Sequence, residues 1–185
     1  MRRNLIITFM LLAGVVVWFH GKDSVGDDVE KTWFRTTTVD FGIVVSDIDK
    51  SVAFYRDVLG MNAASSFNVS TDIAREAGLT KNEPLTVQVM TLGKESTATK
   101  VKLMQVEGTA PQKQNLEYIN STLGMSYMTL HVTNVSEVLK NAAEYDVKPI
   151  ANGPTDISRG SGNNMVLAIV RDPDGNLVEL VGPLN

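Results

Sequence analysis

Apolar and polar positions along residues 37–107 predict a strand, a helix and then three more strands. The run at 39–45 is mostly apolar, as expected of a buried strand. The next stretch repeats its apolar residues at helical spacing, begins after a cap at Asp47 or Asp49, and stops at Gly60. Strand-like runs then follow at 63–69, 85–92 and 100–106.

The second part of the chain, residues 125–183, follows the same order. A strand is expected at 127–132. Asn134 then caps an amphipathic helix, with Glu137 three residues later as in a capping box. Strand-like runs follow at 148–151, 165–171 and 176–182.

These two patterns align as copies of one unit. The segment VVSD at 44–47 matches HVTN at 131–134, an offset of about 87 residues between the repeats. Each copy is a βαβββ module, and the first carries a short helical insert at 70–79. The sequence therefore predicts an α+β domain over 37–183, built from two tandem modules at 37–107 and 125–183.

One acidic residue, Glu179, lies in an unexpectedly apolar setting. The segment VRDPDGNLVELVG at 170–182 is typical of a strand, a tight turn and a second strand. Pro173 favours the turn, and Gly175 supplies its left-handed residue. The second strand places Glu179 among apolar neighbours, where an unpaired carboxylate is costly. We therefore expect a partner for Glu179.

The N-terminal residues 1–21 have the composition of an export signal. Arg2 and Arg3 precede an apolar run from Leu5 to Phe19, which is shorter than the roughly 20 residues of a membrane-spanning helix. No clear small-residue cleavage site follows, so an uncleaved N-terminal membrane anchor is the alternative. Residues 22–36 are polar and acidic, as in a linker. We expect an exported protein, periplasmic or extracellular, or one anchored to the membrane.

Charge argues against two classes of partner. The formal net charge is −4, and without Arg2 and Arg3 the chain keeps 15 basic and 21 acidic residues, a charge of −6. No stripe of Lys or Arg is present, so nucleic acid and anionic membrane surfaces are poor partners. The chain contains no cysteine, which is compatible with an oxidising compartment.

The two modules, the segment SDIDKSVAFYRDVLGM at 46–61 and the segment RDPDGNLVEL at 171–180 resemble the vicinal oxygen chelate superfamily. This superfamily includes glyoxalase I, the fosfomycin- and bleomycin-resistance proteins and the extradiol dioxygenases. The resemblance implies that the sheets of the two modules curl into a barrel-like cup, often paired as a homodimer. It also implies a divalent metal held at the centre of the cup.

The resemblance places the family's four metal-ligand positions on Asp40, Lys102, Tyr127 and Glu179. Glu179 matches the family's last-strand glutamate, whereas Lys102 stands at the corresponding position of the first module. The two first-strand positions, usually histidine, fall on Asp40 and Tyr127. One ligand is thus kept, one is replaced by another acid, and two are lost.

These positions leave three interpretations open, one of which is that Asp40 and Lys102 simply reach solvent at the sheet edge and Glu179 is only partly buried. Sites for Fe, Mn, Ni or Zn rely on neutral imidazoles, and the chain's two histidines are His20, in the export segment, and His131. Asp40 and Glu179 could still bind a hard ion such as Mg²⁺. The preferred hypothesis has no cofactor, with the Lys102 ammonium paired to Glu179 or Asp40.

Two further residues are candidates for the ligand-binding cup. His131 is expected on the inward face of its strand, and Arg159 lies in the glycine-rich loop 157–164, where it could bind an anionic ligand. Both residues also have ordinary structural explanations, as a strand histidine and as part of a solvated loop.

Three hypotheses about function follow. The first is an exported protein that binds a small molecule in the cup after most of the metal site has been lost. The second is a divergent metal-dependent lyase or extradiol-type dioxygenase that uses Glu179 and Asp40. The third is a structural domain held at the membrane by its N-terminus.

Overall fold

The computed structural model describes residues 33–158, 160, 162 and 164–184, and residues 36–185 form one compact unit. The export or anchor segment predicted at 1–21 lies outside the described residues, as does the predicted linker up to residue 32. Within the described part of the chain, no helix is long and apolar enough to cross a membrane.

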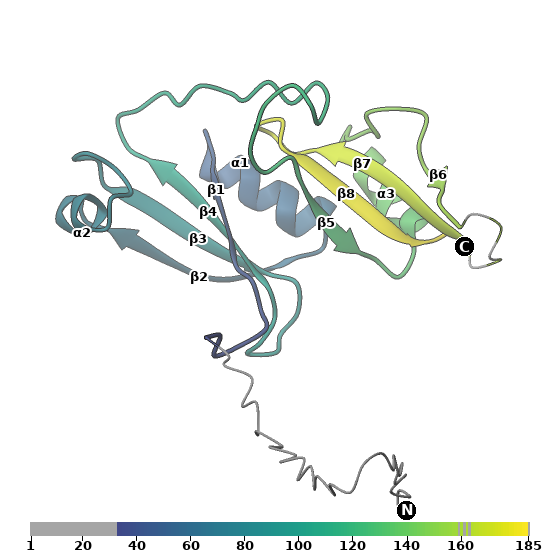
Figure 1. The fold of residues 1–185 in the computed structure, drawn as a ribbon, viewed down its shortest axis with the longest axis horizontal. Coiled ribbons are helices and arrows are strands. Elements are labelled where there is room, and N and C mark those ends of the chain that lie inside the picture. The colour runs from purple at the N-terminus through teal and green to yellow at the C-terminus, as the bar shows by residue number, and fades with distance from the viewer. Residues whose placement is uncertain (1–32, 159, 161, 163, 185) are drawn as a thin grey trace, which may run out of the picture. The chain divides into compact units, whose positions relative to one another are not determined.

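The first module forms one four-stranded sheet in the order β1-β4-β3-β2 (Figure 1). Its first and last strands run parallel to each other, and the other neighbours are antiparallel. A helix begins with α1 and continues as the short π-helix η1. In chain order, the elements are β1 (Phe41–Val44), α1 (Ile48–Ala53), η1 (Phe54–Val58), β2 (Asn62–Val69), α2 (Thr71–Glu76), β3 (Leu85–Thr91) and β4 (Lys100–Val106).

The second module repeats this arrangement in a sheet of order β5-β8-β7-β6, again with its first and last strands parallel. Its elements are β5 (Tyr127–His131), α3 (Val135–Glu144), β6 (Thr155–Asp156), β7 (Met165–Arg171) and β8 (Leu177–Pro183). The predicted α+β fold of two tandem βαβββ modules is confirmed.

One predicted strand is wrong. Residues 148–151 form no strand, and the short edge strand of the second sheet is β6, a few residues later. Pro149 has no N–H to give to a strand ladder. A single backbone hydrogen bond, from the Ile150 N–H to the Ile169 carbonyl, ties this segment to β7.

Both module helices begin at the expected type of cap. Asp47 accepts a hydrogen bond from the backbone N–H of Lys50, and Asn134 accepts one from that of Glu137. At the other end of the first helix, Gly60 adopts a φ of 73°, the left-handed conformation that favours glycine. Local sequence therefore explains where both helices start and where the first one stops.

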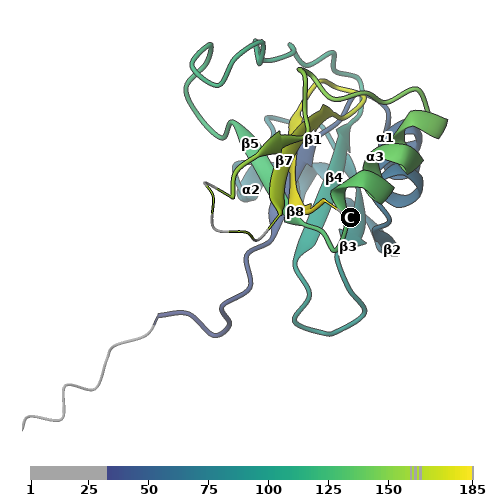
Figure 2. The ribbon, with the colours of Figure 1, turned by 90° about the vertical axis from the view of Figure 1, so that its right-hand side faces the viewer.

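Both modules contribute to one hydrophobic core. The helices α1 and α3 lie on the same side of the two sheets (Figure 2). Alternate strand residues point to that side, among them Val101 and Leu103 of β4 and Val178 and Leu180 of β8. Each fully buried side chain of this size contributes about 1.5–3 kcal/mol. The opposite side of each sheet, here called the open face, carries the intervening residues.

The two helices are also joined by hydrogen bonds. The last carbonyls of a helix have no partner within it, and at the end of η1 the side chain of Asn141 on α3 donates to the carbonyls of Asp57 and Val58, at 2.8 and 2.9 Å. This contact fixes α3 against η1. It therefore helps to set the spacing of the two modules, on which the site described next depends.

Candidate functional site

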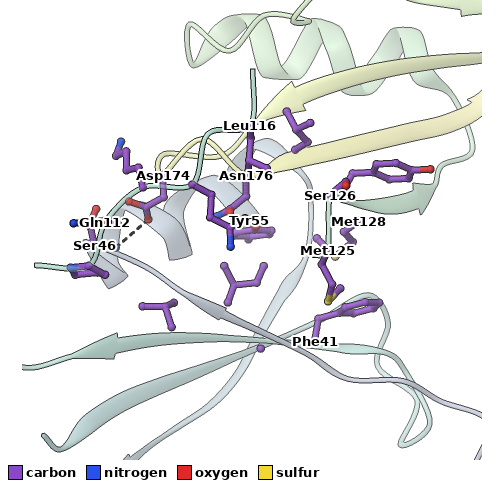
Figure 3. Close-up of a pocket in the computed structure, with 18 residues that line it drawn as sticks. Phe41, Ser46, Tyr55, Gln112, Leu116, Met125, Ser126, Met128, Asp174 and Asn176 are labelled. Atoms are coloured by element: carbon purple, nitrogen blue, oxygen red, sulfur yellow. Dashed lines mark hydrogen bonds between the residues drawn. The ribbon is translucent and has the colours of Figure 1, made fainter. Parts of the chain in front are cut away.

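A cleft of about 370 Å³ lies between β1 and the start of β5, where the two modules meet (Figure 3). This volume is within the range of pockets that hold small organic molecules. Its apolar lining includes Phe41, Ile43, Val44, Leu116, Met125, Met128 and Leu177. Its polar lining includes Ser46, Tyr55, Gln112, Ser126, Tyr127, Asp174 and Asn176.

The cleft has an apolar end and a polar end. In Figure 3, Phe41, Met125 and Met128 gather toward one end, and Ser46, Gln112 and Asp174 lie toward the other. Methionine side chains are flexible and polarisable, so they adapt to apolar ligands and contact aromatic rings favourably. A molecule with one apolar end and one polar end fits this distribution.

The polar end is built by the β7–β8 turn of the second module. Asp172 is 5% exposed and its carboxylate accepts four hydrogen bonds. Two come from the backbone N–H groups of Asp174 and Asn176, at 3.0 and 2.8 Å, and one from the Asn176 side chain at 2.8 Å. The fourth comes from the Tyr55 hydroxyl of the first module, at 3.1 Å. We call this cluster the turn clasp.

The turn clasp joins the modules and sets the protonation of Tyr55. Burial, followed by the neighbouring Asp172 carboxylate, raises the pKa of the Tyr55 phenol well above its ordinary value. The phenol therefore stays protonated and keeps donating to Asp172. A second bond crosses the modules here, from the Ser46 backbone N–H to the Asp174 carboxylate at 3.0 Å.

One wall of the cleft is the connection between the modules, residues 107–126, here called the strap. The strap contributes Leu116, whose side chain is buried. The backbone carbonyl of Leu116 accepts a hydrogen bond from the Arg171 guanidinium at 2.8 Å. The same guanidinium also donates to the Gly175 carbonyl at 2.9 Å. Arg171 thus fastens the strap to the turn clasp.

Two of the predicted site residues meet on the open face of the first sheet. The Lys102 ammonium lies 3.2 Å from the Asp40 carboxylate, and the side chains are 39% and 32% exposed. Lys102 is therefore paired with one of the two partners predicted for it. In the described residues, no ion pair joins Lys102 to Glu179.

Glu179 lies on the open face of the second sheet and has a partner that the sequence did not suggest. The Thr129 hydroxyl donates to its carboxylate at 2.6 Å. The register pairs Thr129 with Glu179 just as it pairs Gly42 with Lys102, so the two module sites are equivalent in backbone position. The expected partner of Glu179 is thus a hydroxyl.

Of the three remaining predicted site residues, one lines the cleft, one lies away from it and one is outside the described residues. Tyr127 lines the cleft and is half exposed. His131 is exposed at the end of β5 and is not among the residues that line the cleft. Arg159 lies outside the described residues.

The residues at the metal positions that the resemblance implies differ from a ligand set for Fe, Mn, Ni or Zn. Among the described residues, no group of three or more His, Cys, Asp or Glu side chains is placed to hold a metal. An ammonium and a phenol occupy two of the four positions, and the Asp40 carboxylate is already paired with the ammonium. Ligand sets for Fe, Mn, Ni or Zn rest on imidazole, thiolate and carboxylate groups.

Sequence reasoning missed most of the cleft, including Tyr55, Asp172, Asn176 and the strap. The signal available was the pair of aspartates in the DPDG turn, together with a tyrosine on the apolar face of the first helix. The position of Tyr55 on that face predicted a buried side chain, and its ring is buried. The pattern gave no sign that its hydroxyl would donate a hydrogen bond to Asp172 in the turn.

Comparison with known proteins agrees with this architecture. The family model of the Glyoxalase/Bleomycin resistance protein/Dioxygenase superfamily matches residues 37–180. No curated protein matches the sequence.

Solved structures share the fold at low identity. A glyoxalase family protein from Bacillus cereus has a TM-score of 0.67 and 16% identity, covering 84% of this chain and 99% of its own. Glyoxalase I from Leishmania major has a TM-score of 0.55 and 23% identity, covering 78% and 85%. Glyoxalase I from Zea mays has a TM-score of 0.56 and 19% identity, and the match spans 80% of this chain but 45% of the maize enzyme.

Proposed function

Because this chain belongs to the Glyoxalase/Bleomycin resistance protein/Dioxygenase superfamily, we propose that it binds a small organic molecule in the cleft between its modules. The cleft itself carries this proposal. It is large enough for such a ligand, it is apolar at one end, and it offers hydroxyl, amide and carboxylate groups at the other.

The proposed binding needs no divalent metal. The support comes from the chemistry of the donor set, since the Lys102 ammonium supplies a positive charge beside Asp40 at a position where relatives place a ligand. Charge-assisted hydrogen bonds can satisfy such a carboxylate without a metal. The alternative, a lyase or dioxygenase that uses Glu179 and Asp40, requires stoichiometric metal and is tested below.

The ligand site is tested with the fluorescent apolar anion 8-anilinonaphthalene-1-sulfonate. We expect saturable binding, and we expect Ser126→Trp to weaken it about tenfold or more, because the indole fills the cleft. The control is Ile73→Trp, which adds the same indole on α2, at an exposed position away from the cleft. Equal binding by both variants and the unmodified chain would overturn the assignment of the cleft.

Metal dependence is tested separately, by elemental analysis of protein purified without chelator. We expect less than stoichiometric Fe, Mn, Ni, Zn and Mg, and unchanged probe binding after chelation. Stoichiometric metal that is lost in both Asp40→Asn and Glu179→Gln variants would favour the enzyme hypothesis instead.

The proposed location is outside the cytoplasm or at the membrane surface. The support is the sequence of residues 1–21, in which two arginines precede an uncharged apolar run. Residues 1–36 fused to a reporter that is active only after export should activate it, and deleting the run from Leu5 to Phe19 should abolish the signal. An inactive fusion would remove this part of the proposal.

A further inference from the structure

Gly42 lies inside β1 and lines the cleft between the modules. Glycine weakens a strand, because it loses more conformational freedom on folding than any other residue and has no side chain to pack. A glycine inside a strand often marks a bulge, a left-handed backbone conformation, or the close approach of another backbone or a ligand. The structure separates these explanations for Gly42.

The fold itself gives no reason for Gly42 to lack a side chain. The register of β1 with β4 is unbroken from Phe41 to Val44, so β1 has no bulge there. The φ of Gly42 lies outside the left-handed region. Apart from its chain neighbours, a Cβ atom added to Gly42 would approach only the end of the Met104 side chain among the described residues, with Cε at 3.0 Å and Sδ at 3.8 Å.

Two other strand positions show what a structural requirement would look like. Gly182 on β8 is also a strand glycine, but a Cβ atom there would run into the backbone carbonyl of Val132, so the fold requires glycine. The position of the second module that matches Gly42 is occupied by Thr129. The module plan therefore accepts a side chain at this position, and the approach of a ligand is the explanation that remains for Gly42.

We infer that Gly42 is a specificity-determining position of the cleft, where a flat aromatic group of the ligand lies directly against the backbone of β1. This inference rests on the proposed function and adds to it the class of ligand and the position that selects it. Gly42 is exposed, so the peptide groups beside it are open to the cleft. The thioether of Met104 lies next to this opening, and methionine sulfur contacts aromatic rings favourably.

The size of residue 42 sets the width of the aromatic group that the cleft accepts. Val44 is two residues further along β1, so it points to the same face as a side chain on residue 42 would. Val44 lines the cleft and is 46% exposed. A branched side chain beside it would narrow the same space, and a wide ring system would lose more contact than a single ring.

Gly42→Ala and Gly42→Val test this assignment with two anionic probes of different width. We expect 8-anilinonaphthalene-1-sulfonate, with its fused rings, to bind about threefold more weakly to Gly42→Ala and about tenfold or more weakly to Gly42→Val, measured by calorimetry. Binding of the single-ring probe benzenesulfonate should change less than about twofold. The matched control is Ser65→Val, which should bind both probes normally, because Ser65 lies in the same row of the sheet on the opposite edge strand, outside the cleft.

Urea unfolding separates a contact with the ligand from a role in the fold. Alanine and valine favour a strand more than glycine does, so both variants should unfold at the same or a higher urea concentration than the unmodified chain. Weaker binding together with a lower urea midpoint would assign Gly42 to the fold and overturn the inference.

The failure of this inference can be told apart from the failure of the proposed function. If Ser126→Trp weakens the fluorescent probe and neither Gly42 variant does, the inference is wrong and the cleft remains the ligand site. If Ser126→Trp has no effect, the assignment of the cleft is wrong and the inference fails with it.

Discussion

The two modules have the same backbone plan but different chemistry on their open faces. In the first, the last-strand residue Lys102 pairs with Asp40. In the second, the equivalent residue Glu179 accepts a hydrogen bond from Thr129. The register of the parallel strand pair is the same in both, so the difference arises from side chains alone.

This contrast shows which positions the fold constrains. Residues facing the helices pack in one shared core, where a change of even one methylene group is felt, so both modules keep them apolar. At the equivalent open-face positions Lys102 and Glu179, which are partly exposed, an ammonium and an acid occupy the same register. The two modules therefore share one fold but differ in the chemistry of these positions.

A second contrast lies in how the modules are held together. The first module offers Tyr55 and the carbonyls of η1, and the second supplies the groups that bind them, Asp172 and Asn141. The contact is thus not symmetric. Breaking the turn clasp should therefore affect stability more than changing either open-face pair.

The largest effect is expected for Asp172→Ala. The substitution leaves the buried Tyr55 hydroxyl and the donors of the turn without their acceptor, so we expect a loss of about 3 kcal/mol in the free energy of unfolding, measured in urea. The control, Asp174→Ala, removes a partly exposed carboxylate and should cost about 1 kcal/mol. Equal losses would mean that the buried Asp172 contributes no more to the contact between the modules than the Ser46–Asp174 hydrogen bond does.

A smaller effect should separate the two open-face pairs. Thr129→Val leaves the Glu179 carboxylate without its short hydrogen bond, and we expect a loss of about 1 kcal/mol. Lys102→Met removes an ion pair that is more than a third exposed on its lysine side, and we expect a change of less than about 1 kcal/mol. A larger loss for Lys102→Met, in the same urea measurement, would show that the first module's pair is the more strongly coupled.

The order of elements could be predicted from the sequence because each depends on local signals. Asn134 and Glu137 predicted the second helix, and the strand-like runs at 100–106 and 176–182 predicted β4 and β8. The strand predicted at 148–151 is absent because Pro149 has no backbone N–H to donate to a strand ladder.

The candidate site was harder to predict because it depends on contacts between distant residues. Asp172 and Tyr55 are separated by 117 positions, and neither local pattern contains the other. The resemblance directed attention to Asp40, Lys102, Tyr127 and Glu179, of which Tyr127 lines the cleft. The strap has no periodic pattern, so its role as a wall became visible only from its contact with Arg171.

The smallest effect concerns the equivalent helix caps, which are an acid in the first module and an amide in the second. Hydrogen bonding to the Lys50 backbone N–H, and then to its ammonium, lowers the pKa of Asp47. The Asp47 contribution to stability is therefore present above its unfolded pKa of about 4 and is lost as the pH falls through the lower folded value. Asn134 has no charge to lose.

The two caps can be exchanged to test this difference. Asp47→Asn keeps a capping oxygen but loses the negative charge, so it should be less stable than the unmodified chain at pH 7, and the gap should close near pH 2. Asn134→Asp should do the reverse, adding an acid-sensitive contribution to α3. Thermal unfolding at a series of pH values measures both. A gap for Asp47→Asn that stays constant down to pH 2 would contradict this explanation, because a difference caused by the charge of Asp47 must disappear when the acid is protonated.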